Sequence, residues 1–445
     1  MVKQRELLTT YGKAKQLMSA YMEEINRAKK EGVPIVWNSI VIPRELTAAY
    51  DVVSVPGEWY SATSGPSQGI ELLETAEACG FPHEVCAYSR LSIGSMIAEK
   101  GFLGEFPKPD VVIGLEGGCN LEAKWMEFIA RYYNVPLFIF DYHSPCYVSP
   151  KHQEQAERDA VEYFVQQAYR YIDFMEQATG QKLNEEKLIN AHITRNTNAE
   201  VWQQIAELWE SVPSPMSFKD LLAYLPFSMF LCASPEELEL ARSLRDELAQ
   251  RVKDGVSGIP EERIRLYFSA PPPWYHLQLL RYLESRGIAV VGSIYYSSNR
   301  FPEELLTGGE AIGGWLNEWS EPTNVDECLM EIAKKWAKTL DYLVPPQHTY
   351  LNLKRRVAQT IERCRVARVD GVVFHCPRGC RKGSIGQLDM RNAVRQALNI
   401  PTLIYEGSPS DPRDYARAAV ESSMSTFLEQ VIADKERKAR SGNGG

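Results

Sequence analysis

The stretch PDVVIGLEGGCN, residues 109–120, sets the fold of the chain around it. Its run from Val111 to Leu115 carries no polar side chain, which is typical of a strand that is buried on both faces of a parallel sheet. Two glycines then precede Cys119. Because glycine lets a backbone pass close to a bulky group, we interpret the loop after this strand as a candidate ligand site.

Similar apolar runs, most of them followed by a stretch with helical periodicity, recur on both sides of this loop. We expect buried strands at residues 35–42, 51–55, 111–115, 135–140, 263–268, 288–294, 369–375 and 401–405. Short apolar strands that alternate with helices predict an α/β fold, in which helices cover both faces of a parallel sheet. The predicted architecture is two doubly wound lobes, of the Rossmann or flavodoxin-like kind, joined by a helical connector.

Changes in composition divide the chain into five predicted segments. Residues 151–209 are charged and helical in pattern, with few turn signals, which indicates a connector packed on the first lobe. The predicted segments are an N-terminal helical segment (1–30), a first α/β lobe (31–150), the connector (151–225), a second α/β lobe (226–435) and a disordered tail (436–445).

Charge and hydropathy exclude several classes of protein. The formal net charge of −9 argues against a nucleic-acid binder, which needs a basic face to neutralise phosphates. The apolar runs are far shorter than the ~20 residues of a membrane-spanning helix, and the polar start has no apolar signal segment. We therefore expect a cytoplasmic protein with no nucleic-acid partner and no membrane. In that reducing compartment, the nine cysteines are expected to be buried small residues, ligands or nucleophiles.

Three of these cysteines, Cys86, Cys119 and Cys380, lie near strand ends or helix starts in both predicted lobes. Ligands of doubly wound sheets bind beyond the carboxyl ends of the strands. Zinc sites usually use closely spaced cysteine pairs, whereas thiolates from distant segments suit an iron–sulfur cluster at the lobe interface. Spacing alone leaves open the alternative that all three are buried, inert thiols.

Short motifs spread over nearly the whole chain resemble one protein family. The motifs, in chain order, are GVP (32–34), IPREL (42–46), EVCAYSR (84–90), GC (118–119) with KW (124–125), APPPWY (270–275), DGVVFHCPRGC (370–380), GQL (386–388) and DPRDY (411–415). In this order and spacing they resemble the 2-hydroxyacyl-CoA dehydratases and ATP-dependent benzoyl-CoA reductases. The similarity is greatest to the larger, cluster-bearing reductase subunit.

The resemblance implies a cofactor and a set of partners. In this family each of two related subunits binds one [4Fe-4S] cluster through three cysteines, which by position match Cys86, Cys119 and Cys380 here. The fourth iron has no protein thiolate and can face the substrate. The implied partners are a related cluster-bearing subunit that forms a heterodimer, an ATP-hydrolysing electron donor with its own [4Fe-4S] cluster, and an acyl-CoA thioester.

The chain length and the loop at 270–275 favour one member of the family. We expect the iron–sulfur subunit of a benzoyl-CoA reductase-type oxidoreductase, which transfers low-potential electrons to an aromatic acyl-CoA and reduces its ring to a cyclic dienoyl-CoA. The main alternative is a 2-hydroxyacyl-CoA dehydratase subunit, a lyase that expels water through a ketyl radical. Two further alternatives are a non-catalytic electron-relay subunit and a metal-free fold with three buried thiols.

Other cysteines and two histidines near the expected site carry weaker hypotheses. Cys376, Cys146 and Cys79 are extra thiols that a double-cubane cluster would use, but the chain lacks cysteines at several positions where relatives with that cluster have them. His143 and His375 each follow an apolar strand. Either histidine could donate a proton to a reduced substrate, and we favour the alternative that each is a polar cap on a buried strand end.

Three basic residues beside the last cysteine, Arg378, Arg381 and Lys382, have two equally favoured interpretations. In the first, they balance the charge of the cluster, bind CoA phosphates or contact the electron donor. In the second, they form a solvated turn. The small polar stretch at 65–69 is expected to be a flexible loop. No phosphate-loop motif is present, so the chain itself is not expected to hydrolyse ATP.

Overall fold

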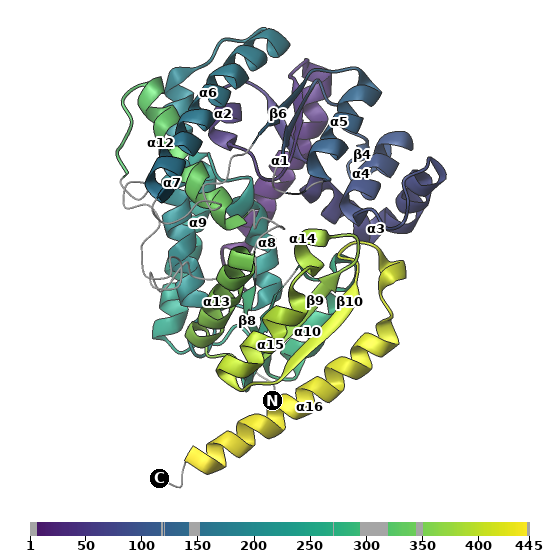
Figure 1. The fold of residues 1–445 in the computed structure, drawn as a ribbon, viewed down its shortest axis with the longest axis vertical. Coiled ribbons are helices and arrows are strands. Elements are labelled where there is room, and N and C mark those ends of the chain that lie inside the picture. The colour runs from purple at the N-terminus through teal and green to yellow at the C-terminus, as the bar shows by residue number, and fades with distance from the viewer. Residues whose placement is uncertain are drawn as a thin grey trace.

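The computed structural model describes residues 7–116, 119, 121–141, 152–269, 271–293, 319–343 and 350–442. Within these residues the chain forms two four-stranded parallel sheets, one in each half of the molecule, with helices packed on both (Figure 1). The predicted α/β fold with two doubly wound lobes is therefore confirmed.

The first sheet contains β1 (Ile35–Asn38), β2 (Val53–Pro56), β5 (Val111–Leu115) and β6 (Leu137–Phe140) in the order β2-β1-β5-β6. Every residue of β1 and β5 is buried, as expected for central strands covered on both faces. The chain runs from β1 to β2 on one side and then returns to place β5 on the other side of β1. Such a reversal opens a crevice at the carboxyl ends of the two strands.

The second sheet repeats this topology with β7 (Ile264–Phe268), β8 (Ile288–Ser293), β9 (Gly371–Pro377) and β10 (Thr402–Gly407). The order is β10-β9-β7-β8, so the reversal lies between β7 and β9. Each sheet thus has its own crevice, one beyond β5 and one beyond β9.

Helices of the first half surround its sheet, together with a small antiparallel hairpin. They are α1 (Tyr11–Glu31), α2 (Arg44–Ala48), α3 (Gly57–Ala78), α4 (Ala87–Ile97) and α5 (Glu122–Tyr133), and the hairpin strands are β3 (Lys100–Gly101) and β4 (Gly104–Glu105). On one face, an aromatic core includes Trp37, whose ring lies 4.8 Å from that of Phe106. This core fixes the strands that lead into the first crevice.

The stretch at 65–69, predicted as a loop, lies inside α3, so that prediction is wrong. The two glycines and Pro66 are poor helix formers by themselves. Packing overrides their propensity, because a β-carbon at Gly65 would lie 3.5 Å from both Leu91 of α4 and Ser410 of the second half. The small residues thus let α3 pack closely on its neighbours.

The connector contains α6 (Gln153–Thr179) and α7 (Glu185–Trp209), and α12 (Val325–Leu343) packs against both. The ring of Trp336 in α12 stacks 5.6 Å from that of Phe164 in α6. Helix α12 thus falls within the predicted second lobe (226–435) but packs in the first half of the molecule. The apolar face of α12 completes the core over β5 and β6.

The remaining helical elements belong to the second half. They are α8 (Phe218–Met229), α9 (Pro235–Lys253), η3 (Trp274–His276), α10 (Gln278–Ser285), α13 (Tyr350–Val366), α14 (Arg381–Ser384), α15 (Gln387–Leu398), η5 (Pro412–Asp414) and α16 (Arg417–Gly442). The long α16 crosses the lower end of the molecule (Figure 1). Among the described residues, no helix is both long and apolar enough to cross a membrane.

The C-terminal tail differs from its prediction, because α16 continues to Gly442 where disorder was expected from residue 436. Ion pairs one helical turn apart support this last part of the helix. Arg437 and Lys438 both pair with Asp434. Such pairs at positions i,i+3 and i,i+4 stabilise exposed helices by about 0.2–0.5 kcal/mol each.

Candidate functional site

The three predicted ligand cysteines all lie where a helix begins. Cys86 is the N-cap of α4. Cys380 is the N-cap of α14 and lies three residues after β9 ends at Pro377. Cys119 follows β5, and its carbonyl accepts the N–H of Glu122 in α5. Two of the cysteines thus occupy the two crevices that the sheet topology creates, and all three are half-buried.

The structure brings these cysteines together across the two halves. Burial raises the pKa of the Cys86 thiol to about 12, and the neighbouring thiols of Cys380 and Cys119 add to this rise. Burial likewise raises the pKa of Cys119, with a further contribution from Cys380. The backbones also touch, because a β-carbon on Gly379 would lie 3.1 Å from the Cα atom of Cys86.

Backbone N–H groups at the helix starts lower the pKa of two of these thiols and bond the third. The groups are those of Tyr88 and Ser89 for Cys86, those of Leu121 and Glu122 for Cys119, and that of Gly383, whose nitrogen lies 3.3 Å from Sγ of Cys380. N–H groups that face sulfur stabilise a thiolate, which is the form of cysteine that binds metal. Three clustered sulfurs with such donors suit an iron–sulfur cluster with three protein ligands.

The other cysteines of the described residues are placed differently. Cys376 is half-buried, and burial, Glu406 and Cys380 raise the pKa of its thiol. Cys79 is exposed, and the remaining cysteines, Cys232, Cys328 and Cys364, are buried. Cys146 and His143 lie outside the described residues. The described thiols therefore give no support to a double-cubane cluster.

The close contact at Gly379 yields a first prediction. Gly379 has a φ of +76°, so Gly379→Ala is expected to lose about 1 kcal/mol of stability from backbone strain alone. The added β-carbon also pushes against Cys86, so the loss should be larger and iron binding should fall. Chemical denaturation and iron analysis measure both effects.

Gly255→Ala is the matched control, because Gly255 has a similar φ of +65° with open space around its β-carbon position. Gly255→Ala should lower stability through backbone strain alone and leave the iron content unchanged. Equal effects of the two substitutions on stability and on iron would contradict a role for the Gly379–Cys86 contact.

A pair of carboxyl groups, Glu58 and Glu122, lies beside the cysteines and was not found from the sequence. Burial and the nearby Glu122 raise the pKa of Glu58 well above its ordinary value, although the N–H of Ile40 donates to its Oε2 at 2.8 Å. Burial also raises the pKa of Glu122, and the Ser39 side chain opposes that rise. Two buried carboxyls in contact share a proton. The charge of Glu122 acts on the Cys119 thiol as well.

A signal for this pair was present in the sequence. Glu58 is the second residue of α3 and lies two residues after the buried strand β2 ends at Pro56. The rule that ligand sites lie beyond such strand ends applies to Glu58 as it does to Cys119. Only the tertiary structure shows that Glu122, the first residue of α5, lies close to it.

The second half contributes a cation to the same place. Burial lowers the pKa of Lys382, and Glu122, Cys119 and Cys380 oppose this fall because they are close to its ammonium group. Lys382 therefore faces the site, whereas Arg381 is exposed. Arg378 pairs with Glu406 and Asp414, at 3.0 Å in both cases. The three basic residues thus do not act as one patch.

His375 is a strand-end cap. Its Nδ1 lies 2.7 Å from the carbonyl oxygen of Pro271 and its Nε2 lies 2.9 Å from that of Gly407. The ring stacks on Tyr405 at 4.6 Å, and only 1% of the residue is exposed. Burial lowers its pKa. With both nitrogens held by backbone carbonyls, His375 is not placed to donate a proton to a substrate.

A second cluster of ligand-type residues, Glu77, His83 and Asp411, has its ligand atoms within 4.8 Å of one another. Two guanidinium groups already bind the same oxygens. Asp411 Oδ2 accepts from Arg90 at 3.1 Å and from Arg413 at 2.8 Å, and both arginines also pair with Glu77. Because two cations occupy the carboxylates, this cluster is an ion-pair network and not a metal site.

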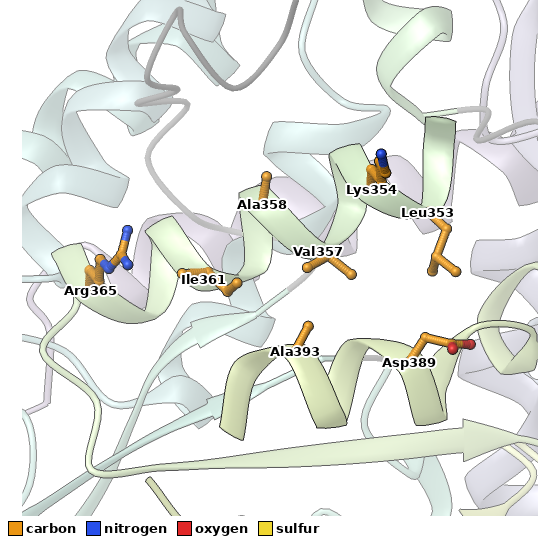
Figure 2. A pocket seen from close by; sticks show the side chains of 8 residues that line it. All are labelled: Leu353, Lys354, Val357, Ala358, Ile361, Arg365, Asp389 and Ala393. Carbon is orange, nitrogen blue, oxygen red and sulfur yellow. The ribbon is translucent and has the colours of Figure 1, made fainter. Parts of the chain in front are cut away.

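A cavity of about 480 Å³ lies between α13 and α15 (Figure 2). Apolar side chains of α13 form much of its wall, and a few charged side chains complete it. The lining residues are Leu353, Lys354, Val357, Ala358, Ile361, Arg365, Asp389 and Ala393. None of the site residues described above lines this cavity.

Comparison with known proteins agrees with this arrangement. Residues 39–431 match the family described as 2-hydroxyglutaryl-CoA dehydratase, D-component. The chain belongs to this family. The residues that match the dehydratase D-component family include all three cysteines and the Glu58–Glu122 pair.

Individual relatives are similar over almost the full length. The chain is 24% identical to the (R)-2-hydroxyisocaproyl-CoA dehydratase alpha subunit of Clostridioides difficile, over 93% of each chain. It is 25% identical to the (R)-phenyllactyl-CoA dehydratase alpha subunit of Clostridium sporogenes, over 92% of each. It is 22% identical to the (R)-2-hydroxyglutaryl-CoA dehydratase alpha subunit of Acidaminococcus fermentans, over 94% of this chain and 96% of the relative.

These relatives change one expectation. All three are named as dehydratase alpha subunits, so the expected benzoyl-CoA reductase type and its oxidoreductase chemistry find no support. The similarity supports the alternative, a 2-hydroxyacyl-CoA dehydratase subunit. The wider resemblance to the dehydratase family is confirmed.

Proposed function

We propose that this chain is the alpha-type subunit of a 2-hydroxyacyl-CoA dehydratase, and that Cys86, Cys119 and Cys380 hold one [4Fe-4S] cluster at the junction of its two lobes. The observation that carries the proposal is the meeting of these three cysteines from opposite halves of the chain. When bound, the cluster would supply one electron at low potential and take it back after water is lost. A related cluster-bearing subunit and an ATP-hydrolysing electron donor complete the proposed enzyme.

The protein groups around the sulfurs suit the proton transfers of such a reaction. Loss of water from a 2-hydroxyacyl-CoA breaks the C2–O bond and removes one proton from C3. In our proposal the neutral carboxyl of the Glu58–Glu122 pair protonates the leaving hydroxide. The carboxylate so formed accepts the proton from C3, which restores the pair. Proton transfer by a positioned carboxyl typically contributes about 10²–10⁴-fold to a rate.

Lys382 supports this arrangement through its charge. Its ammonium group lies close to Glu122 and to the sulfurs of Cys119 and Cys380. A cation there offsets the negative charge of the thiolates and of the ionised carboxyl. Because Lys382 comes from the second half and Glu122 from the first, the charge balance depends on closure of the lobes.

The assay that tests the proposal uses the chain with its partner subunit and the ATP-hydrolysing donor under anaerobic conditions. We expect loss of water from an (R)-2-hydroxyacyl-CoA with only catalytic amounts of ATP, followed by formation of the 2-enoyl-CoA. ATP-dependent consumption of benzoyl-CoA without dehydration would overturn the dehydratase assignment. Binding of the CoA thioester to the partner subunit alone would make this chain an electron relay.

A further inference from the structure

A buried ion pair joins the two lobes close to Cys86. Arg90 belongs to α4, and Asp411 is the N-cap of η5 in the second lobe. Nη2 of Arg90 lies 3.1 Å from Oδ2 of Asp411, and the two side chains are 1% and 0% exposed. Neither charge has access to bulk water, so each relies on its ion-pair partners, which include Arg413 for Asp411 and Glu77 for Arg90.

On the first-lobe side, Arg90 is fixed to the segment that carries Cys86. Its Nε donates to the carbonyl of Val85 at 2.9 Å, and its Nη1 donates to Glu77 at 2.5 Å. Its own backbone N–H donates to the carbonyl of Cys86 at 3.2 Å. The guanidinium plane is therefore tied to the residue just before the cysteine.

On the second-lobe side, Asp411 belongs to the turn that follows β10, and that turn is tied to the Cys380 loop. The Asp411 N–H donates to Ser408 Oγ at 3.0 Å. One residue earlier, the carbonyl of Gly407 accepts the N–H of Arg378 at 2.9 Å. Arg378 is two residues before Cys380. A short chain of contacts thus connects the Arg90–Asp411 pair to both cysteine loops.

Further contacts between the lobes lie around this pair. Nε1 of Trp274 donates to the hydroxyl of Tyr88 at 2.6 Å, and Gly379 packs on the backbone of Cys86. Figure 1 shows α3 and α4 next to the ends of β9 and β10, where these contacts occur. Partly exposed contacts such as His83 with Asp414 and Arg413 with Glu77 also cross between the lobes. The Arg90–Asp411 pair differs from them because both of its side chains are almost fully buried.

We propose that Arg90 is a positioning residue, whose ion pair with Asp411 holds Cys86 of the first lobe at a fixed place relative to Cys380 of the second. The inference rests on the proposed ligand set. A buried ion pair is a weak source of stability compared with an apolar pair of the same shape. Its directional hydrogen bonds nevertheless define one relative position of the two loops, which a three-sulfur site requires.

The test compares Arg90→Met and Arg90→Lys with wild type, using the full chain purified anaerobically. The first measurement is amide hydrogen exchange of segments 83–90 and 377–383 in iron-free protein. The second is iron per chain and the midpoint potential after reconstitution. For Arg90→Met we expect exchange to rise about tenfold or more in both segments, with less than half of the wild-type iron or a shifted potential. Arg90→Lys keeps the charge and should give intermediate values.

Arg378→Met is the matched control, because Arg378 is next to Gly379 but pairs with Glu406 and Asp414 of its own lobe. It should leave exchange in segment 83–90 at the wild-type rate. Asp411→Asn serves as a second variant that removes the charge with almost no change in volume, in case Arg90→Met does not fold. It should reproduce the effects of Arg90→Met.

Failure of this inference is distinguishable from failure of the proposed function. An iron-free wild type would overturn the proposed function, and the exchange measurement would still decide whether the pair holds the two loops together. Unchanged exchange in both segments overturns the inference. So does raised exchange with wild-type iron and potential, because the pair would then stabilise the lobes without positioning the thiols.

Discussion

Replacement of Cys119 by serine is expected to remove almost all iron from the protein. The wild-type chain should bind about four iron atoms in a [4Fe-4S] cluster held by three thiolates. A serine hydroxyl is a harder and far less acidic ligand, so two remaining thiolates should not retain the cluster. Cys86→Ser and Cys380→Ser should have the same effect. Iron and sulfide analysis after anaerobic purification, with the visible absorption spectrum, measures the loss.

Cys79→Ser is the matched control for this prediction, because Cys79 is exposed at the end of α3. It should retain the iron content of wild type. An iron-free wild type would refute the cluster itself. Full iron content in Cys119→Ser would instead show that the ligand set is wrong and would direct attention to Cys376, the half-buried thiol near Cys380.

The raised thiol pKa values add a pH dependence to this prediction. Burial raises the pKa of Cys86 to about 12, and it also raises that of Cys119. Metal can bind only after these protons leave, so uptake of iron and sulfide by the iron-free chain should become faster as the pH rises from 7 to 9. The rate of cluster formation followed by absorbance measures this. A rate that is independent of pH would contradict metal binding by these thiols.

The central strands and the cysteine positions were predictable because their signals are local. The apolar run at 111–115 is buried in the structure as expected, and Cys119 follows it after two glycines. The alternation of strands and helices predicted doubly wound sheets with ligand sites beyond their strand ends, and Cys119 and Cys380 follow such strand ends in the structure. For these features sequence and structure agree, because burial on both faces leaves little choice of residue.

Features that depend on contacts between distant segments were not predictable. An amphipathic helix such as α12 shows that it has an apolar face, but not which sheet that face covers. The helical state of 65–69 depends on the close approach of Leu91 and Ser410, which outweighs the local glycine and proline signal. The proton shared by Glu58 and Glu122 arises only when α3 and α5 are brought together. Reductase and dehydratase chemistry share one scaffold, so sequence motifs of that scaffold do not separate them.

Substitution of Glu58 by glutamine is expected to reduce the dehydration rate by about 10²–10⁴-fold. Glutamine has nearly the shape of a protonated glutamate but cannot give up or accept the transferred proton. The decrease should appear in kcat, with little change in the KM for the acyl-CoA, because the proton transfers belong to the chemical steps. Initial rates with saturating electron donor measure the effect.

The same substitution should make the folded chain more stable at neutral pH. The pKa of Glu58 is raised well above 4.5 in the folded state, so the folded chain binds more protons at this residue than the unfolded chain does. Its contribution to stability is therefore lost as the pH rises from about 4.5 through the folded pKa. Glutamine removes that loss, so Glu58→Gln should unfold at higher denaturant concentration than wild type above this range, and at a similar concentration below it.

Glu71→Gln is the matched control, because Glu71 lies in the same helix, is 63% exposed and pairs with Lys100. It should change neither kcat nor the pH dependence of unfolding. Slower turnover together with higher stability in Glu58→Gln would show that the Glu58 carboxyl lowers stability at neutral pH but is needed for the reaction. This combination is expected for a group retained for chemistry. Wild-type turnover with raised stability would contradict the catalytic role and leave the carboxyl pair as a buried contact between α3 and α5.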